Sequence, residues 1–212
     1  ASVDIDNATS GNIEIAETNA ITVLKAVQGT AGNIGIAAGG TITVANGTTN
    51  NAITAAGSGT ITLSTSSGGD VLINSSIESV TGGIVVAANR VLTIANGAVI
   101  DAGSGTIALQ AQENITLGQV TTTNTGTTAV TLTSAVGRIV DGGDTGGADV
   151  IAGGRLVIDA VTGVGSGNAL ETTVASVDID NATSGNIEIS ETNAVTVFKA
   201  VQGTAGNISL AA

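Results

Sequence analysis

The chain lacks cysteine, proline, histidine, methionine, tryptophan and tyrosine, and its single aromatic residue is Phe198. Without cysteine, the protein has neither disulfide bonds nor thiolate metal sites. Without histidine, cysteine or tyrosine, general acid–base chemistry would fall to isolated aspartates and glutamates. Because aromatic rings are missing, small aliphatic side chains must fill the interior, which suits a narrow core of constant cross-section. We therefore expect a protein that is not an enzyme, with no catalytic residue, metal or cofactor.

Charged residues are also scarce, at 10% of the 212 residues, and 17 acids against five bases give a net charge of −12. Scattered bases without stacking aromatics argue against nucleic-acid binding, and the acidic balance argues against binding to anionic membranes. No apolar run approaches the length of a transmembrane span, so we expect no membrane insertion. The five bases are Lys25, Arg90, Arg138, Arg155 and Lys199.

What the chain does contain is a long internal repeat. Residues 1–38 return as residues 175–212, and five of the 38 paired positions differ. Three of these differences exchange one apolar residue for another, as expected of duplicated units that keep their packing. We therefore describe 1–212 as one continuous segment, with one unit at 1–174 and the start of the next at 175–212. Since the sequence starts within this repeat and without methionine, we expect it to be part of a longer protein.

A shorter period runs inside the long one. The motif Gly-x-Φ-x-Φ, in which Φ is Val, Ile or Leu, occurs nine times, and only Thr128 replaces its glycine. Successive copies are 21–31 residues apart, and seven such steps make up the 174-residue unit. The Φ pairs are Ile13/Ile15, Ile34/Ile36, Ile61/Leu63, Ile84/Val86, Ile107/Leu109, Val130/Leu132, Leu156/Ile158, Ile187/Ile189 and Ile208/Leu210.

Each copy of the motif predicts a β-strand with one buried face, because apolar and polar residues alternate. A second strand follows in step, for example at 21–23 and 92–94, and clusters of Gly, Asn and Ser separate the strands as turns. One coil cannot bury its inner face alone, whereas stacked coils bury it against one another. The sequence therefore predicts an all-β fold, a right-handed parallel β-solenoid of roughly nine coils of 21–31 residues. At about 4.8 Å per coil, a seven-coil unit would be about 34 Å long.

Two Gly-rich stretches are candidates for ligand binding. The turn "DGGDTGGAD" gathers Asp141, Asp144 and Asp149, and carboxylates on a loop suit Ca²⁺. Its spacing is neither that of an EF-hand nor the Gly-Gly-x-Gly-x-Asp repeat of calcium-binding β-rolls, so we interpret it as a solvated turn and keep calcium as the alternative. The stretch "GVGSGN" at 163–168 lacks the lysine and the helix of a phosphate loop, and we interpret it as a turn.

The residue between the two Φ positions is expected to point outward. In this column no two carboxylates align on adjacent coils, which argues against a glycan-degrading enzyme. Two threonines among nine residues also fall short of the regular threonine array of an ice-binding face. The column reads Glu14, Gly35, Thr62, Val85, Ala108, Thr131, Val157, Glu188 and Ser209.

The strands "GNIEI", "GTITL", "GTIAL", "GRLVI" and "GNISL", with their Asn/Thr/Ser/Gly turns, resemble filamentous-haemagglutinin-like large exoproteins along the whole chain. The resemblance implies a long right-handed β-helix at the surface of a Gram-negative bacterium. It also implies a structural segment of an extracellular fibre or adhesin shaft, acting in adhesion, biofilm or filament formation. The expected partners are neighbouring repeats or copies stacked along the axis, and host-cell or matrix glycans. The alternatives are a polysaccharide-binding module and, behind it, a calcium-binding or ice-binding β-solenoid.

Overall fold

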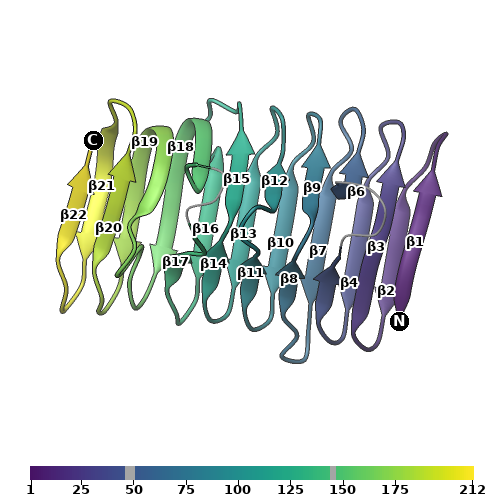
Figure 1. Cartoon of the computed structure of the whole chain (residues 1–212), viewed down its shortest axis with the longest axis horizontal. Helices are drawn as coiled ribbons and strands as arrows, with labels where there is room; N and C mark the ends of the chain where they lie inside the picture. Colours follow the sequence, from purple (N-terminus) through teal and green to yellow (C-terminus); the bar gives the residue numbers. More distant parts are fainter. Residues whose placement is uncertain (46–50, 144–146) are drawn as a thin grey trace.

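The computed structural model describes residues 1–45, 51–143 and 147–212. In this part of the chain, 22 β-strands wind into about nine coils stacked along one axis, with β1 and β22 at opposite ends (Figure 1). All the strand pairs are parallel, and the described residues form no helix. The predicted all-β parallel β-solenoid is confirmed.

Three parallel sheets run along the solenoid. The first sheet contains motif strands β2 (Ile13–Glu17), β4 (Ile34–Ala38), β7 (Ile61–Thr65), β10 (Ile84–Ala88), β13 (Ile107–Ala111) and β16 (Val130–Ser134). The second contains β5 (Ile42–Val44), β8 (Val71–Ile73), β11 (Leu92–Ile94), β14 (Ile115–Leu117) and β17 (Ile139–Asp141). The third contains β6 (Asn51–Ala55), β9 (Ser76–Ser79), β12 (Val99–Asp101) and β15 (Gln119–Thr122). The remaining strands are β1 (Ser2–Asn7), β3 (Ile21–Gln28), β18 (Val150–Ala160), β19 (Leu170–Asn181), β20 (Ile187–Glu191), β21 (Thr196–Gln202) and β22 (Ile208–Ala211).

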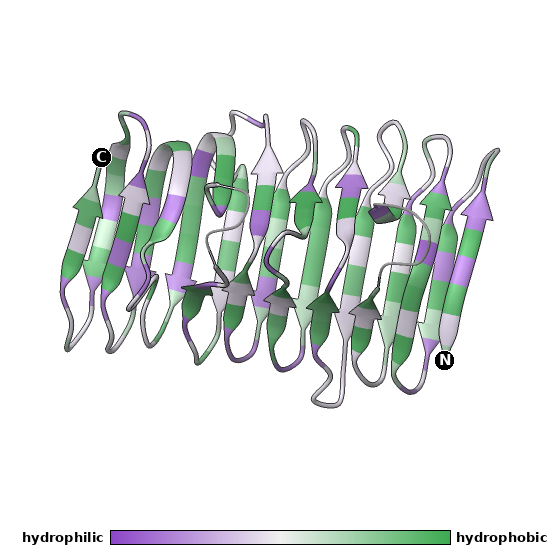
Figure 2. Cartoon of the chain, viewed as in Figure 1, coloured by the Kyte–Doolittle hydropathy of each residue, from purple (hydrophilic) through white to green (hydrophobic). Residues whose placement is uncertain are grey.

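The core is a set of straight aliphatic rows. Along the first sheet, Ile61, Ile84 and Ile107 are each paired with the next and have no exposed surface. The intervening residues Thr62, Val85 and Ala108 face away from this core, and several strands, such as β7, therefore show bands of different hydropathy (Figure 2). Full burial of an aliphatic side chain of this size contributes about 1.5–3 kcal/mol. The rows therefore provide the main stabilisation of every coil.

The corners between strands are held by side-chain amides. The backbone N–H of Asn33 donates to Asn12 Oδ1 (2.9 Å), and that of Thr60 donates to Asn33 Oδ1 (3.0 Å). At the end of β3, buried Gln28 donates through Nε2 to the carbonyl of Gly11 (2.8 Å). Coils are thus joined by hydrogen bonds at the turns as well as along the strands.

The long repeat does not return to the same sheet. Ile13 begins the row of the first sheet, whose later members include Leu156 and Val177. Ile187, which is the equivalent of Ile13 in the second unit, lies instead in the second sheet, where it pairs with Val164. The unit therefore advances by about seven and a half coils. The prediction of seven coils, with Ile187 following Leu156 in one column, is wrong.

The exchange takes place in the coil that follows Leu156. The chain passes through the second sheet at Val164 alone, then forms β19, which runs without a break from the third sheet into the first. Val177 pairs with Leu156, so a full coil has already closed before Ile187 is reached. The long spacing between Leu156 and Ile187 therefore contains one coil plus the step to the next sheet.

Candidate functional site

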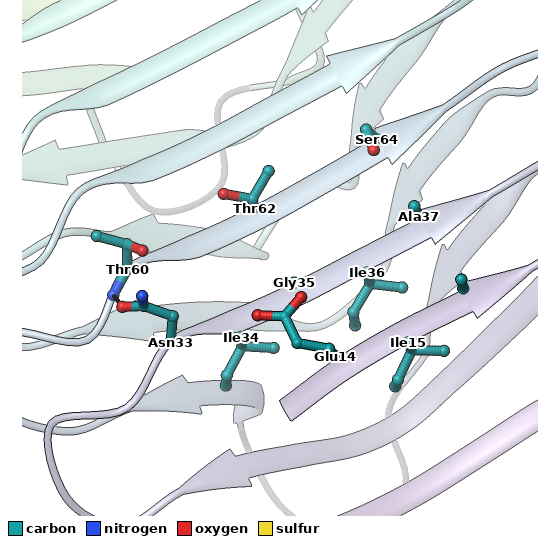
Figure 3. A pocket seen from close by; sticks show the side chains of 11 residues that line it. Glu14, Ile15, Asn33, Ile34, Gly35, Ile36, Ala37, Thr60, Thr62 and Ser64 are labelled. Atoms are coloured by element: carbon teal, nitrogen blue, oxygen red, sulfur yellow. Dashed lines mark hydrogen bonds between the residues drawn. The ribbon is translucent and has the colours of Figure 1, made fainter. Parts of the chain in front are cut away.

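A shallow groove of about 470 Å³ lies over the outer face of β2, β4 and β7 (Figure 3). The groove exists because Gly35 has no side chain. The Glu14 carboxylate lies over Gly35, and a Cβ added to Gly35 would be only 2.3 Å from Glu14 Oε2. Thr60, Thr62 and Asn33 add hydroxyl and amide groups to its wall. The groove offers hydrogen bonds to a polar ligand but only one carboxylate, which is too little for paired acid–base chemistry.

The groove is not repeated in the second unit. Ser209 stands where Gly35 would recur, and Glu188, the equivalent of Glu14, is held elsewhere. Its carboxylate accepts hydrogen bonds from Gly167 N (2.9 Å) and Asn186 Nδ2 (2.8 Å), and these bonds lower the pKa of Glu188. The hollow is therefore a local feature rather than a periodic binding face.

The exchange of sheets also changes the outward column. After Val157 the column continues with Asp178 and Lys199, whereas Glu188 and Ser209 lie in the second sheet. The new neighbours form a charged strip in which Arg155 Nη1 lies 3.8 Å from Asp178 Oδ2. The Arg155 guanidinium also stacks on Phe198, 3.9 Å from the ring centroid. These opposite charges neutralise each other, so the strip is a contact between coils and not a reactive pair.

The acidic turn gives the most concentrated chemistry among the described residues. Asp141 ends β17, Asp149 directly precedes β18, and Glu171 lies at the start of β19. One carboxylate oxygen from each lies within 4.8 Å of the other two. The sequence singled out Asp141 and Asp149, which the fold does bring together; Asp144 lies outside the described residues. Glu171 was missed, because only the stacking of β18 and β19 reveals it.

Asp149 is buried, with 1% of its surface exposed, rather than solvated as the turn interpretation expects. Its Oδ2 accepts the backbone N–H of Glu171 (3.1 Å), while no donor within the described ranges reaches its Oδ1. Desolvation, with the charge of Asp141 next in importance, raises the pKa of Asp149 to about 8. Asp141 is fixed in turn by Gly143 N, which donates to its Oδ1 (2.5 Å), and by the Asn168 amide.

The stretch at 163–168 forms the loop that carries Asn168 to this cluster. Gly163, Gly165 and Gly167 all have positive φ, a conformation that glycine adopts without strain. The loop is therefore a turn, as predicted, and its position beside Asp141 follows from the sheet exchange.

Within the described ranges, no helix is long and apolar enough to cross a membrane. No known family model, curated protein or solved structure matches the chain.

Proposed function

We propose that this chain is a structural segment of a long extracellular shaft, of the kind that the resemblance to filamentous-haemagglutinin-like exoproteins implies. The observation that supports the proposal most strongly is that the strand pairing of the first unit recurs in the second unit. Between β1 and β3, Val3 pairs with Val23 and Asp4 pairs with Lys25 across a bulge. Between β19 and β21, the same residues of the second unit pair in the same way, across the same bulge.

The second unit also continues the stack of the first without a break. Six pairs of residues, from Arg155–Ser176 to Ala160–Asn181, join β18 to the part of β19 that belongs to the second unit, and the rows of the core pass through this junction. Leu156, Val177 and Ile179 are all at most 1% exposed there. A repeat that packs on its predecessor as tightly as on its own coils can be added in series, which is how solenoids lengthen.

The last coil presents the surface on which a further coil would pack. Ile34 is 1% exposed because β7 covers it, whereas its equivalent Ile208 is 45% exposed. Val197 and Val201, in the preceding strand, are exposed as well. This apolar end face has the composition of the core, and the first unit shows what covers it: the coil that contains β5 and β7.

The lateral surface suits a rod that stays separate from its neighbours. A net charge of −12 on a Thr-, Ser- and Asn-rich coat favours solubility and disfavours side-by-side association. The function is mechanical, since the aliphatic rows and the axial ladders of hydrogen bonds act together. In this proposal the ligand-binding parts of an adhesin lie outside the shaft.

Immunogold electron microscopy of the source cells, with an antibody raised against residues 1–174, tests this proposal. We expect gold particles along thin fibres that extend from the cell surface. Labelling confined to the cytoplasm, or to soluble particles without fibres, would refute the shaft. A preimmune antibody is the control for adventitious labelling.

A further inference from the structure

The acidic cluster stands where the two units are joined. Asp141 ends β17 and Asp149 directly precedes β18 in one coil, and Glu171 lies near the start of β19 in the next coil. This is the part of the solenoid in which the repeat changes sheet, and where Val164 alone maintains the second sheet. The second sheet thus has few backbone pairings between coils close to the three carboxylates.

Two separate observations indicate that this cluster is built for a ligand. The first is the geometry: three carboxylate oxygens within 4.8 Å match ligands that surround one cation, because Ca²⁺–oxygen distances of about 2.3–2.6 Å place opposite ligands about 5 Å apart. The second is Asp149, which is only 1% exposed and whose Oδ1 meets no donor among the described residues. Buried carboxylate oxygens are normally paired or bound to a metal.

We propose that Asp141, Asp149 and Glu171 bind one Ca²⁺ ion that fastens β17, β18 and β19 together at the joint between repeat units. The ion neutralises the repulsion between the three acids and occupies the unsatisfied coordination position of Asp149 Oδ1. Calcium fits better than Mg²⁺ because its coordination is flexible and accepts several carboxylates with few waters. This site extends the shaft proposal without depending on it, since a single isolated chain would bind the ion equally well.

Isothermal titration calorimetry of the whole chain with CaCl₂, after treatment with EDTA and desalting, tests the proposal. We expect one ion per chain, with a Kd of about 10⁻⁵–10⁻³ M at pH 8. Saturating Ca²⁺ should also raise the melting temperature by roughly 5–10 °C at about 100 times the Kd.

Three variants make the test specific. Asp149→Asn should abolish the binding, and Glu171→Gln should weaken it at least about tenfold, because each removes a carboxylate charge from the site. Asp101→Asn is the matched control: Asp101 Oδ1 also accepts the N–H of a glycine two residues on, Gly103, as Asp141 does from Gly143. Since Asp101 lies outside the cluster, its variant should bind like the wild type.

Asp149→Asn should also change the melting temperature in opposite directions in EDTA and in Ca²⁺. In EDTA the variant should melt at or above the wild-type temperature, because a buried acid among acids has been removed; in Ca²⁺ it should melt below it. Should Asp149→Asn fail to fold, Glu171→Gln carries the test alone. Absence of saturable binding up to about 10 mM CaCl₂, or wild-type affinity in Glu171→Gln or Asp149→Asn, would overturn the site.

Discussion

Glycine in the Gly-x-Φ-x-Φ motif has a steric explanation at the scale of single residues. The motif glycines stack at one corner of the solenoid, and a Cβ on Gly82 or Gly105 would lie 2.0 Å from the carbonyl oxygen of the preceding motif glycine. Real Cβ atoms do not come so close to backbone. The one exception, Thr128, is exposed, and in that coil Gly126 takes over the contact with the next motif glycine, Gly154.

Two adjacent glycines provide a test of this explanation. We expect Gly82→Ala to destabilise the fold by about 3 kcal/mol, because the stacked backbones must separate. Gly83→Ala should cost less than about 1 kcal/mol, since its Cβ would be 3.3 Å from the nearest atom. Thermal melting followed by circular dichroism gives both values. Equal melting temperatures for the two variants would show that the glycine corner does not limit the stacking.

Asp149 makes stability depend on pH in a direction opposite to that of most carboxylates. Its pKa is about 8 in the folded chain, against about 3.9 for an exposed aspartate. The contribution of Asp149 to the free energy of unfolding is complete below about pH 4 and is lost as the pH rises through about 8. Between these pH values unfolding releases the proton of Asp149, so a higher pH favours the unfolded chain.

In EDTA we therefore expect the melting temperature to fall between pH 6 and pH 9, a window in which no histidine titrates because the chain has none. Asp149→Asn should flatten this profile. A wild-type melting temperature that is constant or rises over the window would show that Asp149 is already ionised in the folded protein.

At the scale of strands and coils, most of the fold can be predicted from the sequence. Alternation of aliphatic residues places motif strands such as β7, β10 and β13 correctly, and their partners are the neighbouring motif copies. The equal steps from Ile61 to Ile84 and from Ile84 to Ile107 each correspond to one coil, so counting motif copies locates the core rows. This works because strand pairing in a solenoid involves only adjacent coils.

Counting motif copies fails where one coil is built without the motif. Val177 lies in the core row of the first sheet although it is not part of a Gly-x-Φ-x-Φ motif. Ile187 is part of such a motif but lies in the second sheet. The spacing between Leu156 and Ile187, the longest between successive motif copies, was the available signal. The acidic cluster could not be predicted completely for the same reason, because Glu171 approaches Asp149 only through the β18–β19 pairing.

Engineered cysteine pairs test the exchange of sheets directly, against a background free of native cysteine. Val157 and Asp178 are paired in the structure, so Val157→Cys with Asp178→Cys should form a disulfide under mild oxidation. Val157→Cys with Glu188→Cys should not, although a seven-coil repeat would make these two residues neighbours. Mass spectrometry of the oxidised chains distinguishes the pairs, and cross-linking of the second pair alone would contradict the exchange.

For the whole molecule, a unit of about seven and a half coils has two consequences. Each unit adds about 36 Å of rod at about 4.8 Å per coil. Equivalent strands of successive units lie on different sheets, as β2 and β20 do. A feature that recurs once per unit would therefore not line up along one side of the shaft.

The most direct test of a solenoid shaft is the length of tandem chains. Chains that contain one, two and three copies of residues 1–174 would be measured by negative-stain electron microscopy. We expect straight rods of constant diameter whose length increases by about 36 Å with every added copy. Particles that thicken instead of lengthening, or that appear as separate beads joined by flexible links, would contradict it.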